Sequence, residues 1–350
     1  MPPPPSLLKG RAIPAHIAGI ATYLPEQILS NDALAALYPS WPAAKILEKT
    51  GIHERHIAAD DETATDLAFA AACRLFDSGA VERADVDFLI LCTQAPDYLL
   101  PTSACILQHR LGLSTQIGAL DINLGCSGFV YGLSLAAGLI ASGAASTILL
   151  LTADTYSKFI HPQDKSVRTL FGDGAAATLI CAGEPDDIAR IGPFVFGTDG
   201  SGARDLIVEA GGARCPRSTL TAEETTDATG NVRSRDNLYM NGGAVLNFTL
   251  REVPRAVLAL LDKTQTTAED YDRFVLHQAN KFMLDALQKK LAVPPKRVSR
   301  HFERIGNTVS STIPFVLERE MADGGCSPGT RMMLVGFGVG LSWAAASIVF

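Results

Sequence analysis

The sequence predicts an α/β fold made of two similar halves, and three observations support this prediction. Short apolar strand patterns alternate with helical patterns along the chain, as is typical of sheets covered by helices. Segments of the first half recur in the second half at nearly constant spacing, which indicates a duplication. A hydrophobic content of 47% with 19% charged residues is that of a well-packed globular enzyme.

The duplication is carried by three repeated elements. An apolar strand, FLILCTQA at 88–95, is matched by RFVLHQA at 273–279. A turn followed by a helical pattern, NLGCSGFVYGL at 123–133, is matched by RIGNTVSSTIPFVL at 304–317. Apolar strands then follow each helix, at 147–154 and 331–338. We therefore expect mainly parallel sheets, with a division of the chain into residues 12–183 and 184–350.

The segments between the repeats are predicted as turns, tails or surface loops. FGDGAAA at 171–177 lacks the Lys-Ser/Thr pair of a P-loop and is interpreted as a tight turn that leads into a strand. Residues 199–236 are polar and predict a long surface excursion, and residues 1–11 predict a frayed tail rather than a secretory signal. The stretch 122–153 carries no charge, but glycines and ASGAAS divide it into a helix and a strand, so no membrane span is expected.

Composition limits the kinds of partner that the protein binds and the cellular compartment in which it works. The net charge of -7 argues against nucleic acid as the main partner. The seven cysteines form no C-x-x-C pair and no metal-binding spacing, which favours free thiols, a reducing cytoplasm and no metal. One local basic cluster indicates either a solvated helix face or a docking surface for an acidic partner. Its members are Lys281, Lys289, Lys290, Lys296, Arg297 and Arg300.

Cys126 lies between Gly125 and Gly128, at the point where a strand pattern ends and a helical pattern begins. A thiol at a helix N-terminus feels the positive end of the helix dipole, which favours thiolate and lowers the thiol pKa. The neighbouring glycines would let a substrate carbonyl approach the Cys126 N–H, which is then a candidate oxyanion donor. The alternative is a small buried hydrophobic side chain at a tight turn.

His277 and Asn307 are the candidates in the second half. His277 directly follows a strand, and Asn307 occupies the turn that is equivalent to the turn of Cys126. Because strand C-termini and helix N-termini gather where two α/β halves meet, the three side chains are expected to converge on one pocket. Asn307 is also suited to be a helix N-cap, the commoner use of asparagine in such a setting.

Taken in order, these motifs resemble the β-ketoacyl-acyl carrier protein synthase III family of the thiolase superfamily. The resemblance covers nearly the whole chain and is carried by TGIHERHIAADDET at 50–63, LPTSA at 100–104, the Cys126 turn, FGDGAAA at 171–177, HQAN at 277–280, GNT at 306–308 and GFGVGLSW at 336–343. It implies a five-layered αβαβα fold and a homodimer, with acyl-CoA and acyl carrier protein thioesters as substrates and no other cofactor.

The resemblance also implies residue roles. Cys126 would accept an acyl group from a thioester, and malonyl-acyl carrier protein would then lose carbon dioxide and attack the acyl-enzyme. His277 and Asn307 would bind the malonyl thioester oxygen, and the N–H groups of Cys126 and Val339 would form the oxyanion hole.

Carrier or CoA contacts are expected at Lys49, Lys165, Lys281 and Arg297. Lys49 and Lys165 replace arginines that are common in the family, and lysine loses their planar stacking and bidentate phosphate contact. Loading of the acyl group is therefore expected to be faster from a carrier protein than from CoA.

Three other functions remain open from the sequence. The first is a specialised O- or N-acyl transferase or condensing enzyme of secondary metabolism on the same fold. The second is a cysteine hydrolase, which shares the order Cys, His, Asn but whose local C-G-S-C-W signature is missing here. The third is a non-catalytic partner subunit.

Overall fold

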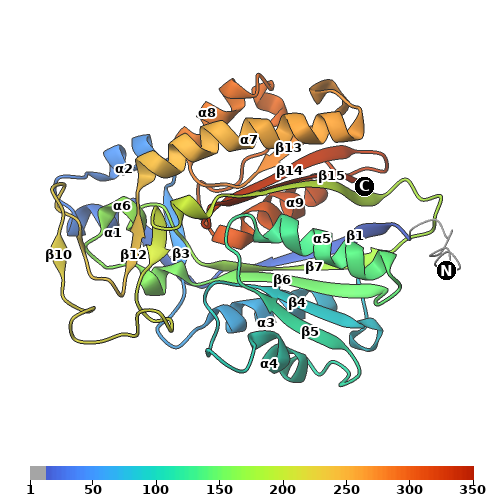
Figure 1. Ribbon diagram of the computed structural model, residues 1–350, viewed down its shortest axis with the longest axis horizontal. Coiled ribbons are helices and arrows are strands. Elements are labelled where there is room, and N and C mark those ends of the chain that lie inside the picture. Colours follow the sequence, from blue (N-terminus) through green and yellow to red (C-terminus); the bar gives the residue numbers. More distant parts are fainter. Residues whose placement is uncertain (1–12) are drawn as a thin grey trace, which may run out of the picture.

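The computed structural model of the protein describes residues 13–350 (Figure 1). The first sheet has the strand order β1-β7-β6-β4-β5 and lies beside three helices. Its strands are β1 (Ala15–Tyr23), β4 (Phe88–Cys92), β5 (Gly118–Ile122), β6 (Thr147–Asp154) and β7 (Gly174–Ala182), and its helices are α3 (Ala64–Asp77), α4 (Ser103–Arg110) and α5 (Gly128–Ala141).

The second sheet repeats this arrangement, with the strand order β13-β14-β15-β8. Its strands are β8 (Arg190–Thr198), β13 (Arg273–Leu276), β14 (Arg331–Gly338) and β15 (Ser342–Val349), and its helices are α7 (Gly242–Thr264), α8 (Lys281–Lys290) and α9 (Thr312–Ala322). Where the first sheet ends in β5, the second has only an isolated bridge between Phe274 and Val298.

Smaller elements cover one end of the two sheets, at the left of Figure 1. They are β2 (Gln27–Ser30), α1 (Asn31–Leu37), α2 (Ala43–Thr50), β3 (Glu54–Ile57), α6 (Lys165–Arg168), β9 (Leu206–Val208), β10 (Thr225–Thr226), β11 (Val232–Arg233) and β12 (Leu238–Met240). Short 3₁₀ helices lie at Arg83–Asp85, Tyr156–Phe159, Gly200–Gly202, Ala268–Asp270, Pro295–Arg297 and Val309–Ser311.

The two sheets and their helices form the five layers that the resemblance implies (Figure 1). In residues 13–350, α3 and α4 cover the outer face of the first sheet, and α7 with α8 cover the outer face of the second. Helices α5 and α9 lie between the sheets, where α5 packs on β6 of the first and on β14 of the second. An apolar cluster fills each of the three interfaces, so the central strands of both sheets are buried on both faces.

The prediction of mainly parallel sheets is wrong, because each sheet is mixed. The pairs β4·β5, β4·β6 and β13·β14 are parallel, whereas β1·β7, β6·β7, β14·β15 and β8·β15 are antiparallel. Strands buried on both faces are apolar throughout, whichever way their neighbours run, so hydrophobicity does not reveal the direction of pairing.

The proposed chain division falls between β7 and β8, in the connection that follows Ala182 and precedes Arg190. Because α5 of the first half also packs on β8, β14 and β15, the two halves share the central layer. The exact boundary at 183/184 stays a prediction, and the predicted N-terminal tail lies outside the described residues. Within residues 13–350, no helix is both long and apolar enough to cross a membrane.

Candidate active site

Cys126 lies in the turn between β5 and α5, two residues before the first residue of the helix, as predicted. Its side chain is buried. The neighbouring positions must be glycine, because other atoms pack too closely there to leave room for a side chain. A Cβ on Gly128 would lie 2.2 Å from Cys92 Sγ, and one on Gly338 would lie 2.8 Å from Cys126 Sγ. A Cβ on Gly336 would lie 2.8 Å from the Cys126 carbonyl oxygen. Strand β14 therefore lies directly against the nucleophile turn.

His277 follows β13, and its backbone N–H donates to the carbonyl oxygen of Val335 at 2.9 Å. The ring stands edge-on to Phe337, with 5.4 Å between the centroids. Burial lowers the pKa of His277 to about 3, so the imidazole is neutral at physiological pH. Ring Nδ1 lies 2.7 Å from Thr312 Oγ1. A neutral, oriented imidazole can donate or accept one hydrogen bond inside the pocket.

Asn307 ties the two halves together. Its N–H donates to Leu170 at 2.9 Å, and its carbonyl oxygen accepts from Gly172 at 3.0 Å. Its side-chain oxygen accepts from the Val309 N–H at 2.9 Å, so the amide nitrogen is left for the pocket. The expectation that Asn307 is a helix N-cap is wrong, because Thr308 holds that position before the 3₁₀ helix Val309–Ser311 and Ser311 holds it before α9. The side-chain oxygen of Asn307 closes a local turn instead, and its amide nitrogen stays free for the pocket.

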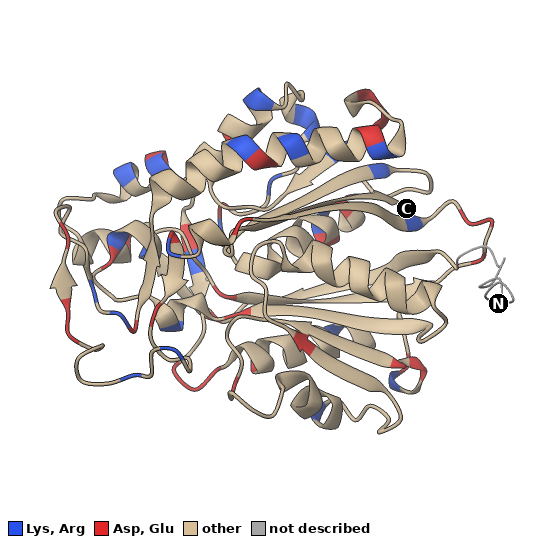
Figure 2. Cartoon of the chain, in the orientation of Figure 1, with Lys and Arg blue, Asp and Glu red and all other residues tan. Residues whose placement is uncertain are grey.

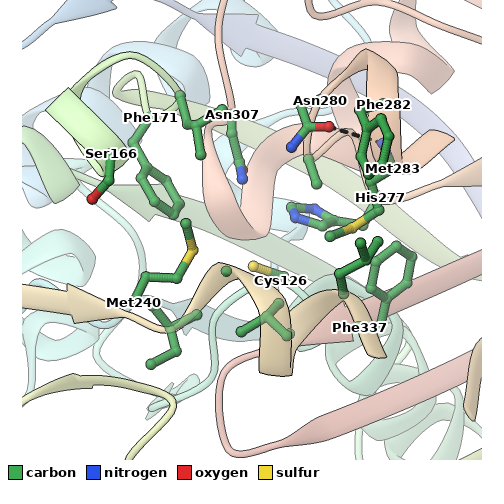
Figure 3. A pocket seen from close by; sticks show the side chains of 17 residues that line it. Cys126, Ser166, Phe171, Met240, His277, Asn280, Phe282, Met283, Asn307 and Phe337 are labelled. Carbon is green, nitrogen blue, oxygen red and sulfur yellow. Dashed lines mark hydrogen bonds between the residues drawn. The ribbon is translucent and has the colours of Figure 1, made fainter. Parts of the chain in front are cut away.

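The structure brings Cys126, His277 and Asn307 to one cavity of about 290 Å³. Figure 3 shows the sulfur of Cys126 facing the His277 ring and the nitrogen of the Asn307 amide. The convergence expected from the repeats is thus present. The remaining wall is largely apolar, with Ser166 and Asn280 as its polar side chains. Part of it comes from the motifs at 171–177, 277–280 and 336–343, and the rest was not predicted because it comes from segments without a motif of their own. Its large side chains are Leu170, Phe171, Leu206, Met240, Val245, Leu246, Phe282 and Met283.

A second cavity of about 930 Å³ adjoins the first. Leu206 lines both cavities, and Val339 of the second follows Gly338 of the first. Tyr156 and Phe159 lie on its wall, and the Tyr156 hydroxyl donates to Gln94 Oε1 at 2.6 Å. Cys126 lines the first cavity only, and the second cavity begins at Val339, next to Gly338 of the first.

The expected lowering of the Cys126 pKa is wrong for the empty pocket. Burial, and to a smaller extent the carboxylate of Asp154, raise the pKa of the Cys126 thiol to about 12. The N–H groups of Val339 and of Cys126 itself hydrogen-bond the thiolate and oppose that rise. Desolvation outweighs the helix terminus here because the sulfur is shielded from water. The thiol is therefore protonated at neutral pH in this structure.

Val339 occupies the loop between β14 and β15, and it is not among the residues with positive φ. A β-branched side chain is therefore tolerated at this position. The N–H groups of Val339 and Cys126 both favour the ionised form of the Cys126 thiol, which makes them the candidate donors for an acyl oxygen bound beside the sulfur.

Lys49 and Lys281 lie on neighbouring helices. Lys49 is exposed on α2, and a Cβ on Gly51, which ends α2, would lie only 2.4 Å from the Cβ of Lys281. Lys281 forms an ion pair of 2.7 Å with Asp285, which also binds Arg300 at 2.6 Å. Phe282, the next residue, lines the cavity and is exposed. Figure 2 shows Lys and Arg positions in blue along α2 and α8. The two lysines are thus close to the mouth of the pocket.

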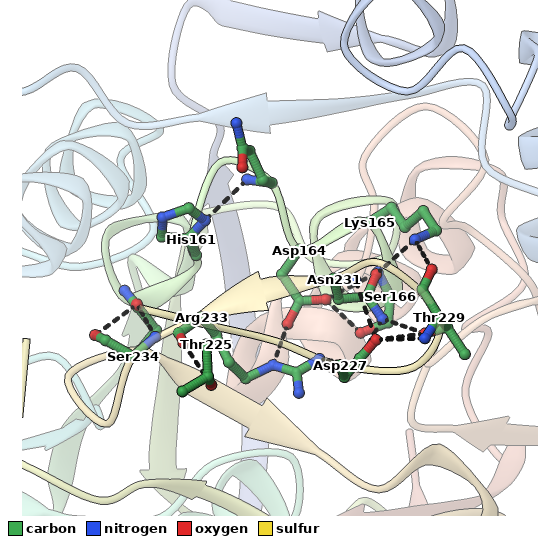
Figure 4. A network of polar contacts seen from close by, with 12 residues as sticks. His161, Asp164, Lys165, Ser166, Thr225, Asp227, Thr229, Asn231, Arg233 and Ser234 are labelled. Carbon is green, nitrogen blue, oxygen red and sulfur yellow. Dashed lines mark hydrogen bonds and ion pairs between the residues drawn. The ribbon is translucent and has the colours of Figure 1, made fainter. Parts of the chain in front are cut away.

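Lys165 directly precedes Ser166, which lines the cavity, but neither Lys165 nor Arg297 lines it. Lys165 Nζ donates to the carbonyl oxygen of Thr229 at 2.6 Å and to Asn231 Oδ1 at 3.1 Å. These bonds belong to a network that fastens the β10–β11 hairpin to α6, in which Arg233 joins the carboxylates of Asp164 and Asp227 (Figure 4). Arg297 makes a long bond of 3.4 Å to the Ala268 carbonyl oxygen.

Within residues 13–350, no group of three His, Cys, Asp or Glu side chains is arranged to hold a metal ion. The seven cysteines lie in this range, and none is paired in a disulfide.

Comparison with known proteins places this architecture in a single family. Residues 120–200 match the family model "3-Oxoacyl-[acyl-carrier-protein (ACP)] synthase III", and residues 261–350 match the model of its C-terminal part. The β-ketoacyl-[acyl-carrier-protein] synthase III of Lactococcus lactis is 36% identical over 341 residues, covering 95% of this chain and 98% of the relative. The Pseudomonas aeruginosa enzyme of that name is 36% identical over 336 residues, covering 95% and 96%.

Solved structures agree with this assignment. A crystal structure of a 3-oxoacyl-(acyl-carrier-protein) synthase III is 61% identical, with a TM-score of 0.95, and covers 96% of this chain and 100% of the other. A 3-oxoacyl-(acyl-carrier protein) synthase from Burkholderia xenovorans is 36% identical, with a TM-score of 0.88, covering 97% and 94%. Both the five-layered fold class and the resemblance found in the sequence are confirmed. The chain belongs to the β-ketoacyl-acyl carrier protein synthase III family.

Proposed function

We propose that this protein catalyses a decarboxylative Claisen condensation between an acyl thioester and malonyl-acyl carrier protein, through an acyl-cysteine intermediate. The observation that carries the proposal is the convergence of Cys126, His277 and Asn307 on one largely apolar cavity. A thiol supplies the nucleophile, and the two nitrogen groups supply uncharged donors for a developing oxyanion.

In the first step, Cys126 attacks the carbonyl carbon of the acyl thioester. The S–H bond of Cys126 and the C–S bond of the donor break, a new thioester forms, and the departing thiol carries the proton. The N–H groups of Cys126 and Val339 bind the tetrahedral oxyanion, as they bind the thiolate. With a thiol pKa raised to about 12 and an imidazole pKa lowered to about 3, a standing thiolate–imidazolium pair is disfavoured in the free enzyme.

In the second step, malonyl-acyl carrier protein occupies the cavity beside the acyl-enzyme. The bond between the malonyl carboxylate and its carbon breaks, carbon dioxide leaves, and the electron pair develops as an enolate on the thioester oxygen. His277 and the Asn307 amide donate to that oxygen. The enolate carbon then attacks the acyl carbon, and Cys126 leaves as a thiolate that takes up one proton from solvent.

The surroundings of the pocket support an acidic carrier protein as partner. Lys49 and Lys281 lie on α2 and α8, and Phe282 of the same surface lines the cavity. We therefore assign carrier contacts to Lys49 and Lys281, with Arg297 as a peripheral charge. Lys165 is better explained by the hairpin that it holds. Because Lys165 is engaged in this way, it offers less charge to the phosphates of CoA. Loading is therefore expected to be faster from a carrier protein than from CoA.

We also propose a cytoplasmic homodimer. The unpaired cysteines are compatible with a reducing compartment. Leu99 and Leu100 are 89% and 82% exposed, and Leu99 borders the second cavity. A partner subunit that covered these leucines would close the end of that cavity and limit the length of the acyl group.

The test is intact-protein mass spectrometry with a panel of acyl-CoA and acyl carrier protein thioesters, followed by addition of malonyl-acyl carrier protein. The proposal predicts a mass increase by one acyl group, then its removal with release of carbon dioxide and a β-ketoacyl product. Acylation that is discharged only by alcohols or amines would instead establish an O- or N-acyl transferase. Discharge by water alone would establish a hydrolase.

A further inference from the structure

His277 has a buried hydrogen-bond partner that the two steps above leave unexplained. Ring Nδ1 lies 2.7 Å from the hydroxyl oxygen of Thr312, the first residue of α9, whose side chain is 2% exposed. Among residues 13–350, no other group forms a hydrogen bond with the His277 ring. A neutral imidazole has one N–H and one lone pair, so whatever occupies Nδ1 determines which of the two is at Nε2.

The Thr312 hydroxyl has two acceptors within reach. One is His277 Nδ1 at 2.7 Å, and the other is the Val309 carbonyl oxygen at 3.2 Å. An O–H···O bond is normally about 2.5–3.0 Å long, so the contact with Val309 is long and weak. The short contact with Nδ1 is therefore the better place for the hydroxyl proton.

We propose that Thr312 is a positioning residue that donates its hydroxyl hydrogen to Nδ1 of His277, so that Nε2 carries the ring proton and faces the malonyl thioester oxygen. The inference rests on the proposed condensation, because that reaction requires a donor at Nε2. A lone pair at Nε2 would face the same developing oxyanion and repel it.

Val309 links this arrangement to the second donor. Its φ is 56°, a left-handed conformation that is rare and strained for a β-branched residue. In this conformation its N–H donates to Asn307 Oδ1 at 2.9 Å, while its carbonyl oxygen lies near the Thr312 hydroxyl. The side-chain nitrogen of Asn307 is thereby turned to the pocket. The two donors to the malonyl thioester oxygen, His277 and Asn307, are thus both oriented by groups that contact the strained residue Val309.

Because the role of Thr312 is specific to one half-reaction, it can be separated from a general effect on the fold. Decarboxylation develops charge on the oxygen that Nε2–H binds, and the ring keeps its proton throughout. Acyl transfer to Cys126 uses the N–H groups of Cys126 and Val339 instead. Loss of the Thr312 hydroxyl should therefore reduce decarboxylation and leave acyl loading nearly unchanged.

The experiment compares the parent enzyme with Thr312→Val, Thr312→Ser and Ser311→Ala. Valine keeps the shape of threonine without the hydroxyl, and serine restores the hydroxyl. Ser311 is the matched control, since it is fully buried, precedes Thr312 and donates to the Thr152 carbonyl oxygen at 3.0 Å rather than to His277. Two rates are measured for each protein, acyl-enzyme formation by mass and carbon dioxide release from malonyl-acyl carrier protein.

We expect Thr312→Val to slow carbon dioxide release about 10- to 100-fold, the loss found when the partner that orients a metal-binding histidine is removed. Acyl loading should stay near the parent rate, and Thr312→Ser and Ser311→Ala should retain most of both activities. Carbon dioxide release by Thr312→Val at the parent rate, or an equal loss in Ser311→Ala, would overturn the proposal. If the parent enzyme releases no carbon dioxide at all, the proposed function fails rather than the role of Thr312.

A second measurement needs no variant. Nitrogen-15 NMR of the parent protein labelled at histidine, with His277 assigned by comparison with His277→Ala, reports which ring nitrogen bears hydrogen. The proposal requires a protonated Nε2 and an unprotonated Nδ1. A proton on Nδ1 would mean that the Thr312 hydroxyl turns to Val309, and the proposal would be wrong.

Discussion

Cys126 lies in a tightly packed turn, and its thiol is protonated at neutral pH. The turn lies against β14 so closely that Gly338 has no room for a side chain. Burial raises the pKa of the Cys126 thiol to about 12, so the thiol is protonated at neutral pH, and the N–H groups of Val339 and Cys126 are the donors that favour its ionised form. Such a thiol resists adventitious oxidation, since oxidation follows thiolate character and exposure.

Cys126→Ala should therefore abolish acylation completely, although six other cysteines remain in the chain. The nucleophile needs both its turn and its oxyanion donors, which the other thiols do not have. Peptide mapping after incubation with an acyl thioester checks this. An acyl group on any other cysteine would contradict the assignment.

Gly338→Ala should block the thiol while leaving the fold in place. The added methyl group would lie 2.8 Å from Cys126 Sγ and 2.9 Å from its Cβ. Such overpacking costs about 1–3 kcal/mol of stability. Gly138→Ala on the helix α5 is the matched control, because nothing lies within 4 Å of the position of its added Cβ. Acylation rates and thermal unfolding of both variants test this, and normal acylation of Gly338→Ala would refute the close approach.

The repeated elements were the most predictable part of the molecule. Strand, turn and helix recur in both halves, and this repetition in the sequence alone predicts that Cys126, His277 and Asn307 share one pocket. The antiparallel insertion of β7 and β15 was not predictable, because buried strands of either direction are uniformly apolar. Thr312 and Val309 were also missed, since neither a hydroxyl at a helix start nor a left-handed valine has a signature in a single sequence.

The neighbouring helices α2 and α8 give a prediction about the carrier. The double variant Lys49→Glu with Lys281→Glu should raise the apparent KM for carrier-bound substrates about 5- to 10-fold, because complementary charge chiefly accelerates association. Small thioesters without a carrier should react as in the parent. Arg83→Glu, in the 3₁₀ helix before β4, is the control charge reversal. Unchanged kinetics with the carrier would reduce the lysines to a solvated helix face.

At the scale of the whole molecule, Asp154 is a titratable group buried where the two halves meet. Its carboxylate accepts from Gln94 N–H at 2.8 Å and from Ser310 N–H at 3.2 Å. Burial nevertheless raises its pKa from 3.8 to about 7. The folded protein thus binds this proton more tightly than the unfolded chain, so the contribution of Asp154 to stability decreases as the pH rises from about 4 to 7.

Asp154→Asn should remove that contribution, whatever its effect on absolute stability. The free energy of unfolding of the variant should rise more steeply with pH than that of the parent over this interval, by up to about 1.4 kcal/mol per pH unit. Urea unfolding at a series of pH values measures both slopes. Parallel curves for the two proteins would show that Asp154 is ionised normally in the folded state.

The central claim, that this pocket performs acyl transfer and decarboxylation with separate sets of donors, is tested most directly by Asn307→Ala. Acyl-enzyme formation and carbon dioxide release from malonyl-acyl carrier protein are measured side by side in the variant and the parent. Because the Asn307 amide is assigned to the enolate alone, the variant should load its acyl group at close to the parent rate. Its carbon dioxide release should fall about 10²- to 10³-fold, as expected for the loss of one oxyanion donor. Carbon dioxide release and condensation at the parent rate would contradict the account, and the O- or N-acyl transfer function would then take its place.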